Sequence, residues 1–92
     1  MIISFKSSET KTLADGYRVR RFVNIAAIAR RKLRQLEIAG RLSDLRVPPG
    51  NRLEALKGER SGQFSIRIND QRRICFRWTD AGPVDVEIVD YH

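Results

Sequence analysis

The chain ends in three side chains that can exchange protons, Asp90, Tyr91 and His92, and His92 is its only histidine. A carboxylate, a phenol and an imidazole can each serve as a general base or a general acid. Lys57 and Arg73 offer fixed positive charge for a transition state in which negative charge develops. Together these residue types suit cleavage of RNA by its own 2′-hydroxyl, because that reaction needs a base, an acid and a cation but no metal ion.

Each of these residues also has an ordinary structural interpretation. The last residues of a chain often fray, so the C-terminal three could form a solvated tail. Lys57 stands beside Gly58, and this pair is common in polar hairpin turns. Tyr91 or His92 could instead stack on an unpaired base. The choice depends on which elements bring Lys57 and Arg73 to the C-terminal end.

Length and composition limit the class of protein. The 92 residues predict a single domain over residues 1–92. No apolar run reaches about 18 residues, and the apolar start is too short for a signal peptide. Cys75 is the only cysteine, which predicts neither a disulfide framework nor a metal cluster. We therefore expect a cytoplasmic protein without a metal or other cofactor.

Positive charge is the strongest global feature. Eighteen Lys and Arg residues against eleven Asp and Glu residues give a net charge of +7. Such a field attracts polyanions, and arginine suits bidentate contact with phosphate. The composition therefore favours a nucleic-acid partner over a surface that is charged only for solubility.

Two helices are predicted in the first half, after a short strand at "MIISF". Ser7 and Ser8 can cap a helix over residues 9–14, which Gly16 ends. A longer helix is predicted over residues 22–40, where one face is apolar. Its opposite face carries arginines that are either solvated or turned toward phosphate. The apolar face consists of Phe22, Ile25, Ala26, Ala29, Leu33 and Leu36, and the basic face of Arg30, Arg31 and Arg34.

The second half switches to a period of two. Residues 64–68, 73–78 and 84–89 alternate apolar and polar side chains and are separated by short turn sequences. This pattern predicts an antiparallel meander with one apolar face. Because the helices come first and the strands follow, we expect an α+β fold with helices on one face of the sheet.

The turns also predict which residues of the polar face lie opposite each other. A three-residue first turn places Arg67 opposite Arg73. Like charges in direct opposition are destabilising, so either this register is wrong or the pair holds an anion. A second turn over residues 79–83 predicts three pairs: Arg77 with Asp85, Cys75 with Glu87, and Arg73 with Val89.

Several motifs, taken in order, resemble the HigB toxins of the RelE/ParE superfamily. They are the opening "IISFK", the basic second helix, "LKGER", "RRI" before an aromatic strand, and the ending "VDYH". The resemblance spans essentially the whole chain. It implies a small α+β toxin with two N-terminal helices packed on a curved antiparallel sheet. It also implies mRNA cleavage on the ribosome and a helix-turn-helix antitoxin of the HigA type, through which alone the toxin would contact operator DNA.

The resemblance assigns Lys57, Arg73, Asp90, Tyr91 and His92 to cleavage. The chain departs from the family where many relatives have His-Pro before "LKG" and this one has Glu54-Ala55. Glu54 either repels the phosphate or acts as the base itself. The family's Trp-Arg-Ile is here Arg72-Arg73-Ile74, which adds charge where RNA would lie. Candidate RNA contacts are Arg30, Arg31, Arg34, Arg60 and Arg67.

Two other functions fit the same sequence. One is a nucleic-acid- or ribosome-binding module without catalysis, a degenerate toxin, and Glu54 is the residue that favours it. The other is a gyrase inhibitor like ParE, although ParE-type chains lack this set of lysine, arginine and Asp-Tyr-His.

Overall fold

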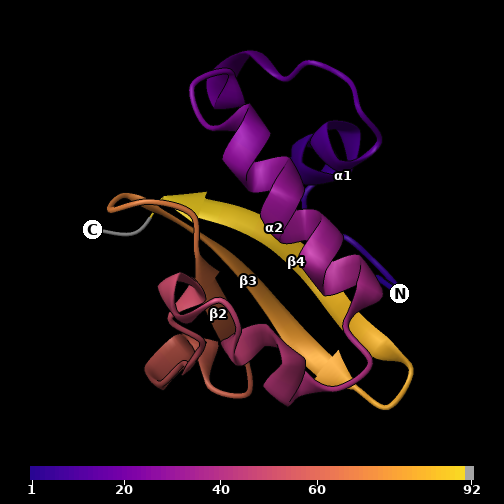
Figure 1. The fold of residues 1–92 in the computed structure, drawn as a ribbon, viewed down its shortest axis with the longest axis vertical. Helices are drawn as coiled ribbons and strands as arrows, with labels where there is room; N and C mark the ends of the chain where they lie inside the picture. Colours follow the sequence, from indigo (N-terminus) through magenta and orange to yellow (C-terminus); the bar gives the residue numbers. More distant parts are fainter. Residues whose placement is uncertain (91–92) are drawn as a thin grey trace.

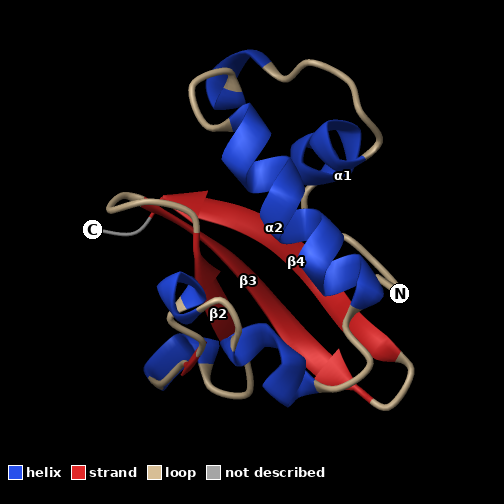
Figure 2. Cartoon of the chain, in the orientation of Figure 1, coloured by secondary structure: helices blue, strands red, loops and turns tan. Residues whose placement is uncertain are grey.

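The computed structural model describes residues 1–90. Two N-terminal helices lie on one face of a four-stranded antiparallel sheet (Figures 1 and 2). This arrangement confirms the predicted α+β class. The strands follow one another in the sheet in the order β1-β2-β3-β4. Their bounds are β1 Glu54–Ala55, β2 Phe64–Arg67, β3 Arg72–Thr79 and β4 Gly82–Asp90.

The first helix, α1, spans Ser8–Ala14 and begins one residue before the predicted start. Ser7 caps it, since the Thr10 backbone N–H donates to the Ser7 hydroxyl at 3.3 Å. The buried Thr10 hydroxyl accepts a hydrogen bond of 3.0 Å from the Ile88 backbone N–H in β4. This bond fixes α1 against the sheet.

The second helix, α2, spans Ala26–Ile38, so the predicted start at residue 22 was wrong. Arg20–Phe22 instead form a separate 3₁₀ turn, η1. Val23, Asn24 and Ile25 separate the two and are poor helix formers. The apolar face was predicted correctly apart from Ala26, which is only partly buried. Its fully buried members are Phe22, Ile25, Ala29, Leu33 and Leu36.

The core lies between α2 and the inner face of the sheet, the face turned toward the helices. Ile66, Ile74 and Phe76 are fully buried there, and Val86 and Ile88 continue the apolar surface on β4. The predicted alternation therefore places these side chains correctly. Among the residues described, no helix combines the length and apolar character needed to cross a bilayer.

A β-bulge in β4 overturns one predicted pair. Arg77 lies opposite Val84, not Asp85, because the register shifts between Cys75 and Arg77. Asp85 occupies the bulge with φ +54°, and its backbone N–H donates to the Ser4 hydroxyl at 2.9 Å. The other predicted pairs are confirmed: Cys75 with Glu87, Arg73 with Val89, and Arg67 with Arg73.

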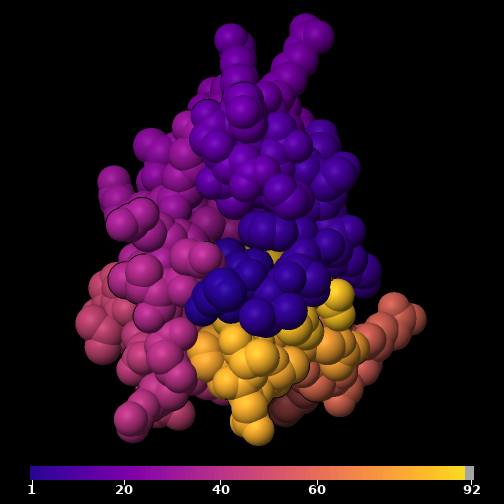
Figure 3. Space-filling model, turned by 90° about the vertical axis from the view of Figure 1, so that its right-hand side faces the viewer, coloured from indigo at the N-terminus to yellow at the C-terminus, as the bar shows by residue number. Residues whose placement is uncertain are grey.

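The N-terminal segment runs beside β4 but forms only one isolated bridge, between Phe5 and Val86. Its backbone N–H groups at Ile3 and Lys6 donate to the carbonyls of Pro83 and Val86 at 2.8 and 3.0 Å. The space-filling view shows this indigo segment directly against the orange-yellow part of the sheet (Figure 3). The segment covers the free edge of the sheet and brings Lys6 beside β4.

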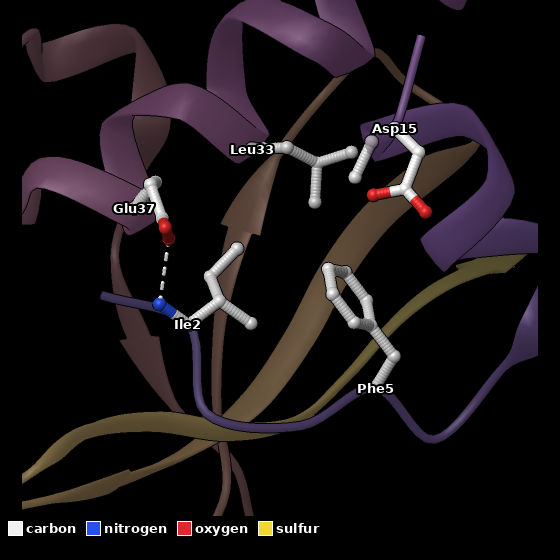
Figure 4. Close-up of a pocket in the computed structure, with 6 residues that line it drawn as sticks. Ile2, Phe5, Asp15, Leu33 and Glu37 are labelled. Atoms are coloured by element: carbon white, nitrogen blue, oxygen red, sulfur yellow. Dashed lines mark hydrogen bonds between the residues drawn. The ribbon is translucent and has the colours of Figure 1, made fainter. Parts of the chain in front are cut away.

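A small cavity lies between the N-terminal segment and the two helices (Figure 4). Its volume of about 220 Å³ is below that of common ligand sites. The Ile2 backbone N–H donates to a Glu37 carboxylate oxygen at 2.7 Å across its mouth (Figure 4). None of the predicted site residues within residues 1–90 lines this cavity, so we look for the candidate site on the sheet. The lining residues are Ile2, Phe5, Ala14, Asp15, Leu33 and Glu37.

Candidate functional site

A row of polar residues crosses the outer face of the sheet, the face turned away from the helices. Glu54, Ser65, Cys75 and Glu87 lie directly opposite one another on β1, β2, β3 and β4. We call these four residues the outer row. Its central members, Ser65 and Cys75, are completely buried. A carboxylate therefore stands at each end of a buried polar strip.

The connection between β1 and β2, residues 56–63, covers the outer row. Leu56 is buried but is not part of the main apolar core. The backbone N–H of Leu56 donates to the Gln63 carbonyl at 2.8 Å, and Gly58–Arg60 form a 3₁₀ turn, η4. At Gly62, where φ is +90°, a Cβ would lie only 2.7 Å from the Arg77 guanidinium. This close packing holds the segment that carries Lys57 and Arg60 on the outer face.

Arg73 is fixed at the Glu54 end of the row. One of its terminal nitrogens lies 3.1 Å from a Glu54 carboxylate oxygen, and the other donates to the Ser65 hydroxyl at 3.2 Å. The Arg73 side chain is only 15% exposed, whereas that of Glu54 is 50% exposed. The structure thus brings two predicted site residues together and makes Glu54 the counter-ion of Arg73.

Glu87 gathers two cations at the other end of the row. Its carboxylate oxygens lie 3.5 Å from the Lys6 ammonium and 3.9 Å from an Arg60 guanidinium nitrogen. Sequence reasoning placed Glu87 on the polar face but missed Lys6, Ser65 and Glu87 as site residues. Alternation could have indicated Ser65 and Glu87. Lys6 depends on the pairing of the N-terminal segment with β4, which no local pattern signals.

Cys75 lies between these two charged ends. Burial raises the pKa of its thiol above the usual range; Glu87 also raises the pKa, while Arg60, Arg73 and Lys6 oppose the shift. A protonated, buried thiol is a poor nucleophile. Cys75 therefore has a structural role.

The opposition of Arg67 and Arg73 is real, and acidic neighbours explain why the sheet tolerates it. Arg67 forms an ion pair with Asp70 in the turn between β2 and β3. Arg73 forms its ion pair with Glu54 in β1. Each guanidinium therefore has its own carboxylate, which reduces the repulsion between the two.

Lys57 is exposed at the start of the η4 turn. Its ammonium group forms no ion pair with any of residues 1–90. It lies three residues after Glu54, on the segment that covers the outer row. Lys57 therefore presents an accessible positive charge on this segment.

Asp90 is the last residue of β4 and lies opposite Arg72. Val89 lies opposite Arg73, so successive β4 residues begin on opposite sides of the pleat. Asp90 thus follows Val89, the residue opposite Arg73, but its side chain leaves the sheet on the face turned toward the helices. Tyr91 and His92 lie outside the described residues, and their predicted roles stay predictions.

Arg72 lies away from the outer row, and the expectation that it adds charge where RNA would lie stays a prediction. Its guanidinium lies 5.2 Å from the centre of the Phe22 ring, on the helix side of the sheet. Arg21 approaches the same ring at 4.8 Å. Arg72 therefore takes part in cation–π contact with the helical layer.

Arg30 was predicted on a helix face that is either solvated or turned toward phosphate, but it bonds to backbone carbonyls, and its contact with RNA stays a prediction. Its guanidinium donates to the backbone carbonyls of Leu13 and Tyr17 at 3.1 and 2.9 Å. It thereby joins α2 to the end of α1 and the loop that follows. Arg31 and Arg34 are exposed on α2, and their contact with RNA stays a prediction.

No group of three or more His, Cys, Asp or Glu side chains within residues 1–90 is placed to hold a metal ion. The cations paired with the two carboxylates of the outer row, Arg73 at one end and Lys6 and Arg60 at the other, can bind an anion and stabilise negative charge. Proton transfer would depend on Asp90 and the two residues that follow it.

Comparison with known proteins gives the same family as the motifs. A family model described as the RelE-like toxin of type II toxin–antitoxin system HigB matches residues 10–92. Toxin HigB-1 of Vibrio cholerae serotype O1 is 54% identical over 50 residues, which cover 54% of this chain and 53% of that protein. An uncharacterized protein of Haemophilus influenzae is 34% identical over 55 residues, covering 60% and 54% respectively.

These matches span about half the length of the curated relatives. The family model, in contrast, covers the chain from the middle of α1 to its last residue. The chain therefore belongs to the HigB-like family of RelE-like toxins from type II toxin–antitoxin systems.

Proposed function

We propose that this toxin is a ribosome-dependent mRNA endoribonuclease that inhibits translation by metal-independent cleavage through the RNA 2′-hydroxyl. The observation that carries the proposal is the outer-face position of Arg73, which is held by Glu54 and Ser65. A cation fixed in this way can stabilise charge on a phosphate without further reorganisation. Membership of the HigB-like family supports RNA as the substrate.

The cleavage step needs one proton removed and one supplied. A base takes the 2′-hydroxyl proton, and the 2′-oxygen forms a bond to phosphorus. The bond from phosphorus to the 5′-oxygen then breaks, and an acid protonates that oxygen. Arg73 and Lys57 stabilise the negative charge on the non-bridging oxygens of the phosphorane, and Asp90, Tyr91 and His92 are the groups assigned to proton transfer. His92 suits this task because imidazole titrates near neutral pH.

Glu54 has two possible roles in this mechanism. Its ion pair with Arg73 favours the role of counter-ion, which reduces the charge that Arg73 offers to the phosphate. A carboxylate at this position could otherwise act as the base for the 2′-hydroxyl. The counter-ion role predicts faster cleavage when the charge is removed, and the base role predicts slower cleavage.

The partners follow from the same family. We propose a helix-turn-helix antitoxin of the HigA type as the neutralising partner, with operator DNA contacted only through that antitoxin. The ribosome and its mRNA are the targets, in the cytoplasm.

A toxin that binds without cleaving is the second candidate. The Glu54–Arg73 ion pair favours it, because a neutralised arginine stabilises a phosphorane less. Primer extension on a reporter mRNA after brief induction separates the two. Defined cuts that appear with induction support the nuclease, whereas arrest of translation without cuts supports the binding module.

The cation roles are tested by single-turnover cleavage on programmed ribosomes at saturating toxin. Arg73→Ala and Lys57→Ala should each slow cleavage by about 100-fold, as loss of a charge-stabilising donor does. Arg46→Ala is the control and should cleave at close to the native rate, since Arg46 is exposed and lies outside the outer row. A native rate for Arg73→Ala would show that this residue is structural only.

Truncation tests the C-terminal residues. A chain ending at Val89 should lose cleavage while keeping the far-ultraviolet circular dichroism of the native protein. Asp90 is exposed at the end of β4, so its removal should leave the core intact. Growth arrest and mRNA cuts by a folded truncated chain would contradict the assignment of Asp90, Tyr91 and His92.

A further inference from the structure

The outer row ends in two separate groups of charge. Arg73 lies with Glu54 and Ser65 at one end. Lys6 and Arg60 lie with Glu87 at the other. With strands about 4.8 Å apart, the four-strand row separates the backbones of Glu54 and Glu87 by roughly 14 Å. Arg73 pairs with the carboxylate at one end of the row and Lys6 and Arg60 pair with the carboxylate at the other, and the proposed chemistry uses only the Arg73 end.

The second group, Lys6, Arg60 and Glu87, is assembled from three distant parts of the chain. Lys6 follows the bridge between Phe5 and Val86, Arg60 ends the η4 turn, and Glu87 lies in β4. We call these three residues the Glu87 cluster. Its assembly requires the N-terminal segment, the covering connection and the sheet to be in place together, so it exists only in the folded protein.

The cluster is layered, with the acid beneath the cations. The Glu87 side chain is 16% exposed, whereas those of Arg60 and Lys6 are 35% and 61% exposed. An incoming anion therefore meets the two cations before it meets the carboxylate. Two cations and one carboxylate leave a net positive charge, which attracts phosphate.

The contacts within the cluster are long. Separations of 3.5 and 3.9 Å exceed the length of a normal charge-assisted hydrogen bond. One Glu87 oxygen is buried and accepts no hydrogen bond from any of residues 1–90. One Arg60 nitrogen donates to the Gln63 side-chain oxygen at 3.2 Å. Glu87 thus holds Lys6 and Arg60 in place by charge while leaving the Lys6 ammonium and the remaining Arg60 N–H donors available to a bridging oxygen anion.

We propose that the Glu87 cluster is a second phosphate-binding subsite, in which Lys6 and Arg60 hold an RNA phosphate flanking the one that is cleaved and Glu87 positions the two cations. This inference rests on the proposed function for the identity of the substrate. In this arrangement the RNA backbone runs along the outer row, over the connection that covers Cys75. Its reacting phosphate lies at Arg73, and a flanking phosphate lies at Lys6 and Arg60.

Binding is measured with the full-length protein and a single-stranded RNA oligonucleotide that carries 2′-O-methyl groups and therefore cannot be cleaved. Lys6→Gln/Arg60→Gln keeps much of the side-chain bulk and removes both charges. It should weaken binding about tenfold at moderate salt. The slope of log Kd against log salt should fall by about 0.7, the value of one phosphate contact on a single strand.

Arg46→Gln/Arg41→Gln is the matched control, because it removes two exposed arginines near the 3₁₀ turn of residues 42–46, outside the outer row. It should leave the slope nearer to the native value than the Lys6 and Arg60 variant does. Equal slopes for the two double variants would overturn the subsite, since charge alone would then explain the loss.

Glu87→Gln tests the positioning role. Removal of one negative charge should leave oligonucleotide binding unchanged or tighter, while cleavage on programmed ribosomes at saturating toxin falls severalfold. If binding and cleavage both increased, Glu87 would be only a repulsive charge. If both fell, the carboxylate would be needed for folding or binding rather than for positioning. Either result would overturn this role.

The two proposals fail in different ways. If the native protein made no mRNA cuts but the Lys6 and Arg60 variant still lost one phosphate contact, the nuclease would be wrong and the subsite would stand. If Arg73→Ala abolished cleavage while the Lys6 and Arg60 variant bound and cleaved as the native protein does, the subsite would be wrong and the nuclease would stand.

Discussion

Strand β3 has a different environment on each of its two faces. On the inner face, Ile74 and Phe76 are fully buried in the apolar core beneath α2. On the outer face, Arg73 and Cys75 are also largely buried, but among polar and charged groups from other strands. Neighbouring residues of one strand thus take part in two kinds of burial.

The difference separates stability from function. Apolar burial is non-directional and scales with the area removed from water, so the inner face depends mainly on size and shape. The outer face depends on individual pairs such as Arg73 with Glu54, whose strength depends on geometry and local dielectric. The inner face should therefore control the free energy of unfolding, and the outer face should control binding and cleavage.

The comparison is tested most strongly at two adjacent residues. Phe76→Ala should lower the free energy of unfolding by about 3–5 kcal/mol, because it empties a large space in the core. Cys75→Ala, on the outer face, should cost about 1 kcal/mol, since a smaller side chain is shortened. Urea unfolding followed by circular dichroism measures both. Equal losses for the two variants would break the distinction between the faces.

The helical layer offers a second test, because it contains a polar contact that serves stability. Arg30→Ala removes hydrogen bonds to the carbonyls of Leu13 and Tyr17 and should destabilise the protein by about 1–2 kcal/mol. Arg31→Ala is the control, since Arg31 is exposed on the same helix and should change stability by less than about 0.5 kcal/mol. Thermal unfolding compares them. Similar losses of stability in the two variants would show that the Arg30 hydrogen bonds do not stabilise the fold.

Patterns that repeat within one element predicted much of the inner face. The spacing of Ala29, Leu33 and Leu36 identified the buried side of α2. The period of two placed Ile74 and Phe76 on the core side of β3. Both signals are local, because burial on one face imposes the geometric period of the element on its sequence.

The features that were missed depend on contacts between distant segments. The bulge at Asp85 shifts the register where the Asp85 N–H bonds to Ser4, and no pattern within β4 signals it. Arg30 has the spacing of an exposed residue, yet it bonds to carbonyls after α1. Lys6 reaches Glu87 only because the N-terminal segment pairs with β4.

On the outer face, substitution of Glu54 should have a smaller effect, which is measured as a change in cleavage rate. Glu54→Gln removes a charge that neutralises Arg73, while the Ser65 hydroxyl still holds the guanidinium. If Glu54 is only a counter-ion, cleavage should become about five- to tenfold faster, corresponding to roughly 1 kcal/mol after screening. Glu54→His should also be faster, since a neutral imidazole does not repel phosphate.

Single-turnover cleavage on programmed ribosomes decides between the two roles of Glu54. A Glu54→Gln protein that is slowed about 100-fold would identify Glu54 as the base. A rate equal to the native one would show that the Arg73 ion pair does not limit the charge available to the phosphate. Circular dichroism of each variant serves as the folding control.

The smallest expected effect concerns Cys75 and alkaline pH. Burial raises the pKa of its thiol, and Glu87 adds to the shift while Arg60, Arg73 and Lys6 reduce it. In the unfolded chain the thiol loses its proton above about pH 8.5, whereas the folded protein keeps it to higher pH. Because the folded state then binds more protons than the unfolded state, stability falls as pH rises through this window.

Cys75→Ala removes this contribution and leaves all other titrating groups in place. The free energy of unfolding should therefore decline less steeply above about pH 8.5 in Cys75→Ala than in the native protein. Urea unfolding at a series of pH values from neutral to alkaline measures the difference. If stability fell equally steeply with pH in the two proteins, the thiol would ionise alike in the folded and unfolded states. Water would then reach the outer row, although it is excluded from the inner face.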